Sequence, residues 1–227
     1  YANAYVYVTG HYIGENHYGY AQFAFELAPW LYCDGATENV IAVKVVNKIP
    51  SSRWYSGSGI YRDVTLSMAE PVHFARFGHF VTTPDITQGQ GTVRVQSEIV
   101  SSVDEAMRLT LTHRIFEKGG DTPLAAVSCK CDLPAGETVR RENCLLVENP
   151  KLWSVDEPNL YQVQTAISAN GRLLDEETTV FGFRYCSFDE SGFHLNGKNI
   201  KLNGVCLHPD QGALGAAAYG DAIARQL

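Results

Sequence analysis

Charged residues are scarce in this sequence, and long apolar runs are absent. Charged side chains make up 19% of the 227 residues, and the formal net charge is −7. An acidic chain without a cluster of Lys and Arg is a poor nucleic-acid binder. None of its apolar runs is long enough to span a bilayer, and its first residues lack the basic-then-apolar pattern of a signal peptide. We therefore expect no nucleic-acid partner and no membrane partner.

Motifs that mark several common classes of protein are also missing. The sequence has no zinc-type spacing, no G-x-S-x-G turn, no phosphate-binding loop and no dinucleotide fingerprint. Its 6 cysteines form no C-x-x-C pair and no disulfide framework. Cys129 and Cys131 fall on one face of a predicted strand, where buried free thiols are favoured over a metal-binding pair. Free thiols favour a reducing compartment.

The first part of the chain is typical of a β-sandwich. Hydrophobic residues make up 45% of the whole sequence, as in well-packed globular proteins. Alternating apolar residues and tight turns predict strands at 5–8, 11–13, 23–27, 39–46 and 60–66. These are fewer than the roughly eight strands of a complete jelly roll. We therefore expect only part of such a domain.

The middle of the chain predicts a second all-β unit, after a boundary at Glu70-Pro71. The apolar-face positions of one of its strands are Leu109, Leu111, His113 and Ile115. The pair Asn170-Gly171 marks a two-residue hairpin turn. Seven or so short strands over about 110 residues fit an immunoglobulin-like sandwich. The sequence lacks the Cys-Trp-Cys core of antibody domains.

The pattern changes in the last part of the chain. Phe193–Leu195 and Ile200–Leu202 flank an Asn196-Gly197 turn, which predicts another hairpin. A helix is expected over Ala222–Leu227, with Asp221 as its N-cap.

One loop carries a group of side chains suited to a sugar. From Ser51 to Val64 the sequence reads S-S-R-W-Y-S-G-S-G-I-Y-R-D-V. Arg53 stands beside Trp54 and Tyr55. Such rings stack on apolar sugar faces, and a guanidinium donates to hydroxyls in fixed directions. The alternative is an aromatic-lined loop that plugs the end of a sandwich. From residue types alone, that alternative is favoured.

Two segments resemble signatures of one enzyme family. Ser58 to Val64 is similar to the signature near the end of the jelly-roll domain in family 2 glycoside hydrolases, which include β-galactosidases, β-glucuronidases and β-mannosidases. With S-S-R-W-Y-S-G ahead of it, the segment is most similar to the β-galactosidase branch. Lys201 to Asp210, with Gly212 to Gly215, resembles the first strand of that family's catalytic barrel. Two matches in the right order are more specific than either alone.

The resemblance implies a mainly β fold in three parts. Residues 1–69 would be the C-terminal part of a jelly-roll sugar-binding domain, and residues 70–186 an immunoglobulin-like β-sandwich. Residues 187–227 would begin a truncated (β/α)8 barrel, with its first strand at Gly204–Leu207 and the start of a helix. The active sites of such barrels lie at the carboxyl ends of their strands.

Four substrate-binding residues follow from the resemblance. His208 matches the histidine that contacts the sugar in the −1 subsite, where it can donate to a hydroxyl or stabilise developing charge. Asp210 would orient His208 or touch a hydroxyl, and shaping the loop is an equal alternative for it. Arg53 would reach the site, with Trp54 forming its rim.

Neither catalytic carboxylate is expected in these residues. Retaining glycosidases use two carboxylates about 5–5.5 Å apart. In this family both are glutamates on later barrel strands, and the acid/base follows an Asn. The sequence contains no Asn-Glu dipeptide. We therefore expect no catalytic residue, no metal ligand and no cofactor here, with Mg²⁺ or Na⁺ bound elsewhere in the barrel.

The sequence thus predicts part of a retaining β-galactosidase, inactive by itself, whose full protein takes a β-galactoside substrate. A β-glucuronidase or a β-mannosidase of the same family is one alternative. A non-catalytic β-sandwich that binds carbohydrate is another. Unpaired strand edges can pair between chains, so a homo-oligomer is a further alternative. We expect a bacterial and cytoplasmic protein.

Overall fold

The structure, a computed structural model, describes residues 3–48, 58–206, 212–215, 217 and 219–226. The chain forms two compact units. The first contains Tyr1–Leu66 and Val205–Leu227, and the second contains Ser67–Gly204. The domain limits predicted after residues 69 and 186 stay predictions. Within the described ranges, no helix is both long and apolar enough to cross a membrane.

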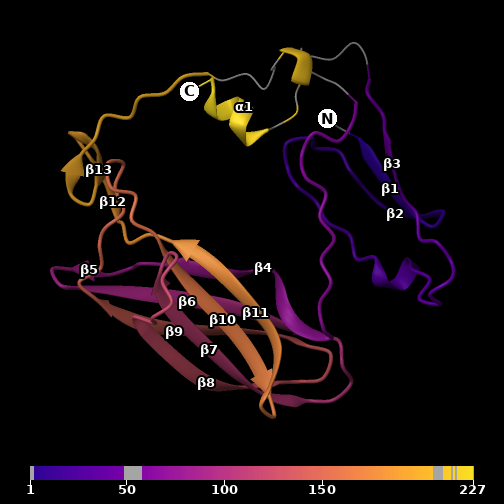
Figure 1. Cartoon of the computed structure of the whole chain (residues 1–227), viewed down its shortest axis with the longest axis horizontal. Coiled ribbons are helices and arrows are strands. Elements are labelled where there is room, and N and C mark those ends of the chain that lie inside the picture. Colours follow the sequence, from indigo (N-terminus) through magenta and orange to yellow (C-terminus); the bar gives the residue numbers. More distant parts are fainter. Residues whose placement is uncertain (1–2, 49–57, 207–211, 216, 218, 227) are drawn as a thin grey trace. The chain divides into compact units, whose positions relative to one another are not determined.

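The first unit holds a three-stranded antiparallel sheet in the order β2-β1-β3 (Figure 1). Its strands are β1 (Ala4–Val8), β2 (His11–Asn16) and β3 (Ile41–Val45). Three of the strands predicted here are thereby confirmed. Val6 and Val8 of the central strand are buried. The unit also contains the short helices η1 (Ala28–Trp30), η2 (Gly212–Leu214) and α1 (Gly220–Ala224).

Two strands predicted in this unit are wrong. No strand is formed at residues 23–27 or 60–66, and Ile60, Val64 and Leu66 are exposed. A strand is stable only where a neighbour takes its backbone hydrogen bonds. Neither segment has such a neighbour among the described residues, so alternating residues alone do not make it a strand.

The last part of the chain also differs from expectation. Residues 204–206, the described part of the predicted barrel strand, form no strand. Helix α1 has Tyr219 at its N-cap, without a side-chain hydrogen bond, and Asp221 lies in its first turn. The N-cap prediction for Asp221 is therefore wrong. An acidic residue in the first turn still stabilises a helix through the macrodipole.

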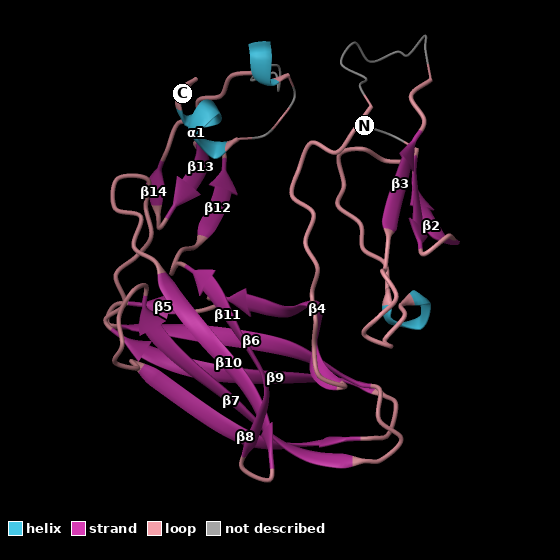
Figure 2. Ribbon diagram, turned by 45° about the vertical axis from the view of Figure 1, so that its right-hand side comes forward, coloured by secondary structure: helices cyan, strands magenta, loops and turns pink. Residues whose placement is uncertain are grey.

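The second unit is a β-sandwich of two antiparallel sheets that face each other (Figure 2). One sheet has the order β11-β10-β7-β8. In the other, β6 pairs with β4 and β5 along one edge and with β9 along the opposite edge. The strands are β4 (Val72–Thr82), β5 (Ile86–Thr87), β6 (Gln90–Ser101), β7 (Met107–Glu117), β8 (Ala125–Leu133), β9 (Thr138–Glu148), β10 (Tyr161–Ala169) and β11 (Arg172–Phe181). The mainly β fold predicted from the sequence is confirmed.

The core between these sheets has two apolar clusters. Buried members of the first include Phe74, Ile99, Leu111 and Ile167, and those of the second include Val95, Ile115, Val163 and Phe183. Each cluster draws on both sheets, because alternate side chains of every strand point inward. Burying one such side chain contributes roughly 1.5–3 kcal/mol.

The two Asn-Gly turns that the sequence predicts both form. Asn170 and Gly171, with φ of 51° and 80°, join β10 to β11. Asn196 and Gly197, with φ of 52° and 78°, follow β13 in a small sheet of its own. Positive φ at both central residues is the type I′ geometry that suits the twist of paired strands. That sheet contains β12 (Cys186–Asp189), β13 (Gly192–Leu195) and β14 (Lys198–Asn199). The predicted strand at 200–202 is therefore wrong, because the two-residue turn places the pairing residues directly after Gly197.

Candidate functional site

The four residues predicted to bind substrate lie outside the described part of the chain. They are Arg53, Trp54, His208 and Asp210. Their roles therefore stay predictions.

The described part of the first family-like segment is held by an aromatic side chain. The hydroxyl of Tyr61 donates to the carbonyl of Gly19 at 2.5 Å. The guanidinium of Arg62 lies 5.4 Å from the centroid of the Tyr61 ring, within the range of a cation–π interaction. Tyr61 thus fixes this segment within the first unit, although the segment forms no strand.

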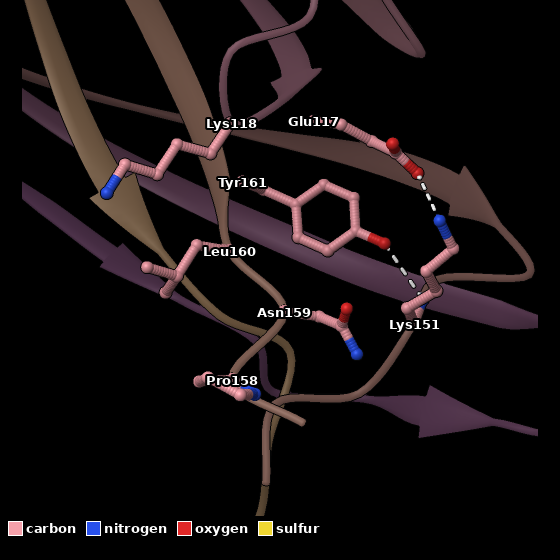
Figure 3. Close-up of a pocket in the computed structure, with 7 residues that line it drawn as sticks. All are labelled: Glu117, Lys118, Lys151, Pro158, Asn159, Leu160 and Tyr161. Atoms are coloured by element: carbon pink, nitrogen blue, oxygen red, sulfur yellow. Dashed lines mark hydrogen bonds and ion pairs between the residues drawn. The ribbon is translucent and has the colours of Figure 1, made fainter. Parts of the chain in front are cut away.

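A pocket of about 390 Å³ opens in the second unit where β7 ends and β10 begins (Figure 3). Tyr161 points across it, and its hydroxyl accepts a hydrogen bond from the backbone N–H of Lys151 at 2.8 Å. Nζ of Lys151 lies 3.2 Å from Oε1 of Glu117. The lining residues are Glu117, Lys118, Lys151, Pro158, Asn159, Leu160 and Tyr161.

The contacts in this pocket anchor a loop. Tyr161 is 2% exposed and packs edge-on against Phe183, with ring centroids 5.0 Å apart. The pair of Lys151 and Glu117 is exposed and stabilises the fold by only about 0–1 kcal/mol. A retaining glycosidase needs two carboxylates, and this lining contains one, on Glu117. The pocket therefore has a structural explanation and is not a hydrolytic centre.

A layer of polar side chains crosses the core between the two apolar clusters. His113 and Thr165 are at most 1% exposed, and Nδ1 of His113 lies 3.0 Å from Oγ1 of Thr165. On the other side of the ring, Nδ2 of Asn143 lies 3.2 Å from Nε2 of His113. An amide nitrogen only donates, so Nε2 accepts and the ring proton lies on Nδ1. Both ring nitrogens of neutral His113 therefore have a hydrogen-bond partner, Thr165 at Nδ1 and Asn143 at Nε2.

A second buried histidine lies in the same layer. Nδ1 of His79 is 3.0 Å from Oγ of Ser97, and its Nε2 is 3.4 Å from Oε2 of Glu177 without the geometry of a hydrogen bond. Burial lowers the pKa of His79, and the negative charge of Asp175, which favours the protonated ring, offsets only part of this shift. Burial, and then the neighbouring His79, lowers the pKa of His113 to about 4. Both rings are therefore neutral near pH 7 and act as structural hydrogen-bonding groups.

All 6 cysteines are free thiols. Cys131 is buried, and burial raises the pKa of its thiol. Sγ of Cys129 accepts a hydrogen bond from Asn143 at 3.5 Å. Both are free thiols, as favoured from the sequence, but only Cys131 is buried and Cys129 is half-buried. Across the described ranges, no group of three or more His, Cys, Asp or Glu residues is placed to hold a metal ion.

Residues 73–184 match the model of the glycosyl hydrolases family 2. Over its whole length the chain is 38% identical to the β-galactosidase BoGH2A of Bacteroides ovatus, of which it covers 27%. A crystal structure of a family 2 member from Bacteroides cellulosilyticus matches the whole chain with a TM-score of 0.92 and 37% identity, over 31% of that structure's chain. The β-glucuronidase of Bacteroides uniformis matches 99% of the chain with a TM-score of 0.86 and 33% identity, over 28% of its own chain.

The fold, the two sequence signatures and these matches define one class of protein. The chain belongs to glycosyl hydrolase family 2. It spans about a quarter of the length of the β-galactosidase that it matches. Both β-galactosidases and β-glucuronidases occur among the proteins to which it is similar.

Proposed function

We propose that the chain is part of a retaining β-galactosidase that hydrolyses terminal β-galactosides through a glycosyl-enzyme intermediate. The observation that carries this proposal is the 38% identity over the whole chain to a β-galactosidase. The S-S-R-W-Y-S-G stretch supports it, since this form is most similar to the same branch. The two catalytic glutamates would lie on barrel strands outside the 227 residues, so these residues alone would be inactive.

In this proposal the chain contributes binding groups. His208 and Asp210 would contact the sugar from the end of the first barrel strand, and Arg53 and Trp54 would contact it from the jelly roll. The second unit would be the immunoglobulin-like domain that separates these two parts. Its seven long strands in two facing sheets support that role. A bound Mg²⁺ or Na⁺ would lie elsewhere in the barrel.

The test compares nitrophenyl β-galactoside, β-glucuronide and β-mannoside as substrates. The gene product that contains residues 1–227 and the 227-residue chain itself are assayed side by side. We expect the former to hydrolyse the galactoside fastest and the latter to hydrolyse none above background. A higher kcat/KM for the glucuronide or the mannoside would refute the substrate. Hydrolysis by the 227-residue chain would refute the claim that it is inactive.

A β-glucuronidase is the second candidate, and one observation favours it. A solved β-glucuronidase covers 99% of the chain at 33% identity. A glucuronide carries a carboxylate, and a bidentate guanidinium is well suited to bind it. If Arg53 serves that purpose, Arg53→Lys would raise KM for a glucuronide at least tenfold and leave hydrolysis of a neutral galactoside unchanged.

A further inference from the structure

A groove of about 490 Å³ lies on the outer face of the sheet formed by β4, β6 and β9. It shares no lining residue with the pocket at Tyr161. All three strands contribute to its lining: Phe77, Gly78 and Phe80 from β4, Gln96, Ser97 and Glu98 from β6, and Arg140, Arg141 and Glu142 from β9.

The strand register sets these side chains in two rows. Phe80 pairs with Gln96, and Gln96 pairs with Glu142, so all three share one row across the sheet. Glu98 pairs with Arg140 in the next row on the same face. Side chains two residues apart on a strand point to the same face, about 7 Å apart. The face therefore presents fixed polar groups beside an aromatic edge.

A bulge in β4 places Phe77 at this edge. Phe74 pairs with Ile99 but His79 pairs with Ser97, so β4 has extra residues between two ladder positions. Phe77 has φ of 56°, a conformation that bulky residues rarely adopt. Bulges re-aim side chains, and the ring of Phe77 is 75% exposed. The strained backbone thus holds an aromatic ring that is largely in solvent, where little packing offsets its cost.

The next residue shows that the bulge is tightly built. A Cβ on Gly78 would lie 2.6 Å from the carbonyl oxygen of Ala75 and 3.0 Å from that of Glu98. Phe80, on the same edge, is 62% exposed. The guanidinium of Arg76 lies 4.6 Å from the centroid of the Phe77 ring, within the range of a cation–π interaction. The groove therefore has two exposed rings on a fixed backbone.

The polar groups of the groove are balanced in charge. Nε of Arg140 lies 2.5 Å from Oε2 of Glu98, and Nε2 of Gln96 donates to Oε2 of Glu142 at 2.7 Å. Arg94 reaches the other oxygen of Glu142 at 3.5 Å. Paired charges give an ionic ligand no net attraction, but they hold donors and acceptors in place for hydroxyl groups.

We propose that this groove binds a neutral oligosaccharide. Exposed rings stack on the apolar faces of sugars, and the guanidinium, amide and carboxylate groups beside them match ring hydroxyls. A protein partner would be expected to cover a contiguous apolar patch. Here the rings stand at one edge of a polar face. The choice of a carbohydrate rests on the proposed function, although the groove would act by binding and not by hydrolysis.

The test is an NMR titration of the isotope-labelled 227-residue chain with a galacto-oligosaccharide. We expect saturable shifts of the backbone amides of Gly78, Gln96 and Glu142. Phe77→Ala should weaken this binding at least fivefold. Phe188→Ala is the matched control, because Phe188 is 77% exposed and lies in β12, outside the groove. It should bind as the wild type does.

Two results would overturn the proposal. One is the absence of saturable shifts in the groove. The other is equal binding by Phe77→Ala and the wild type. Groove shifts that depend on protein concentration in the absence of sugar would instead assign the face to a second copy of the chain, and would also overturn it. If the gene product that contains residues 1–227 prefers glucuronides, the proposed function is refuted. The NMR titration of the groove still tests oligosaccharide binding in that case.

Discussion

Nδ1 of His113 and Oγ1 of Thr165 lie 3.0 Å apart in the middle of a core that is apolar on either side. Thr165 belongs to β10 and His113 to the neighbouring β7, where the two residues are register partners. The opposite sheet supplies Asn143 to the second ring nitrogen. A buried polar group without such partners would cost about 1–3 kcal/mol. The layer therefore ties the two sheets together in one register.

The first prediction concerns the pH dependence of stability. The pKa of His113 is lowered to about 4 from 6.5, so between these values the unfolded chain binds a proton that the folded chain does not. Stability is then complete above pH 6.5 and falls as the pH drops toward 4. The loss from His113 is about 3 kcal/mol. The lowered pKa of His79 adds to this loss of stability at low pH. The raised pKa of Glu177 partly offsets both losses, because the folded chain binds a proton there more readily than the unfolded chain does.

Urea unfolding of the 227-residue chain at several pH values between 7.5 and 4 measures this effect. In His113→Gln the slope of unfolding free energy against pH should be clearly smaller than in the wild type. His11→Gln is the control, because His11 is exposed, and its slope should match the wild type. Equal slopes in all three proteins would contradict the role of His113.

The sequence predicts the sandwich well because one face of each long strand is buried. Val95 and Ile99 of β6 and Leu109 of β7 alternate with polar residues, and that period is visible without a structure. The sequence likewise predicts the turns at Asn170 and Asn196, since Asn-Gly is the preferred residue pair of type I′ turns. Both signals are local, so they need no knowledge of which strands become neighbours.

Features that depend on residues far apart in the chain cannot be predicted from local sequence patterns. His113 stands on the apolar face of its strand, but its partners Thr165 and Asn143 lie 52 and 30 residues away. The segment 60–66 has strand-like residues, yet no partner among the described residues pairs with it. The β4 bulge around Phe77 has one local signal in the sequence, the following residue Gly78. The candidate role of His208 rests on the motif resemblance, and that of Arg53 rests on the resemblance and on its aromatic neighbours Trp54 and Tyr55.

A second prediction concerns the strain at Phe77. A left-handed backbone costs a bulky residue about 1–2 kcal/mol, and glycine is free of this cost. Phe77→Gly should therefore raise the unfolding free energy by about 1 kcal/mol, although it removes a large ring. Phe80 does not have positive φ, so Phe80→Gly should lower it by about 1 kcal/mol. Urea unfolding of both variants measures whether the unfolding free energy rises or falls. A lower unfolding free energy in both variants would exclude strain at Phe77.

A third prediction tests the contact between β6 and the aromatic core. A Cβ on Gly91 would lie 2.5 Å from Cε1 of Phe183 and 3.0 Å from Cγ of Pro150. Phe183 is fully buried and cannot move aside, so Gly91→Ala should destabilise the chain by about 1–3 kcal/mol. Gly204→Ala is the control, because no atom lies within 4 Å of its Cβ position. Its effect should stay within about 0.5 kcal/mol. Equal melting temperatures for both variants would show that Phe183 is free to shift.

The last prediction addresses substrate binding. If His208 donates to a sugar hydroxyl as charge develops on the ring, its loss removes an interaction that is strongest in the transition state. In the gene product that contains this chain, His208→Ala should lower kcat/KM for an aryl β-galactoside about a hundredfold, while the melting temperature stays unchanged. His11→Ala, at an exposed position, should keep full activity. If His208→Ala retains kcat/KM, the resemblance of the second segment does not extend to the role of its histidine. A loss confined to KM would instead assign His208 to binding of the ground state.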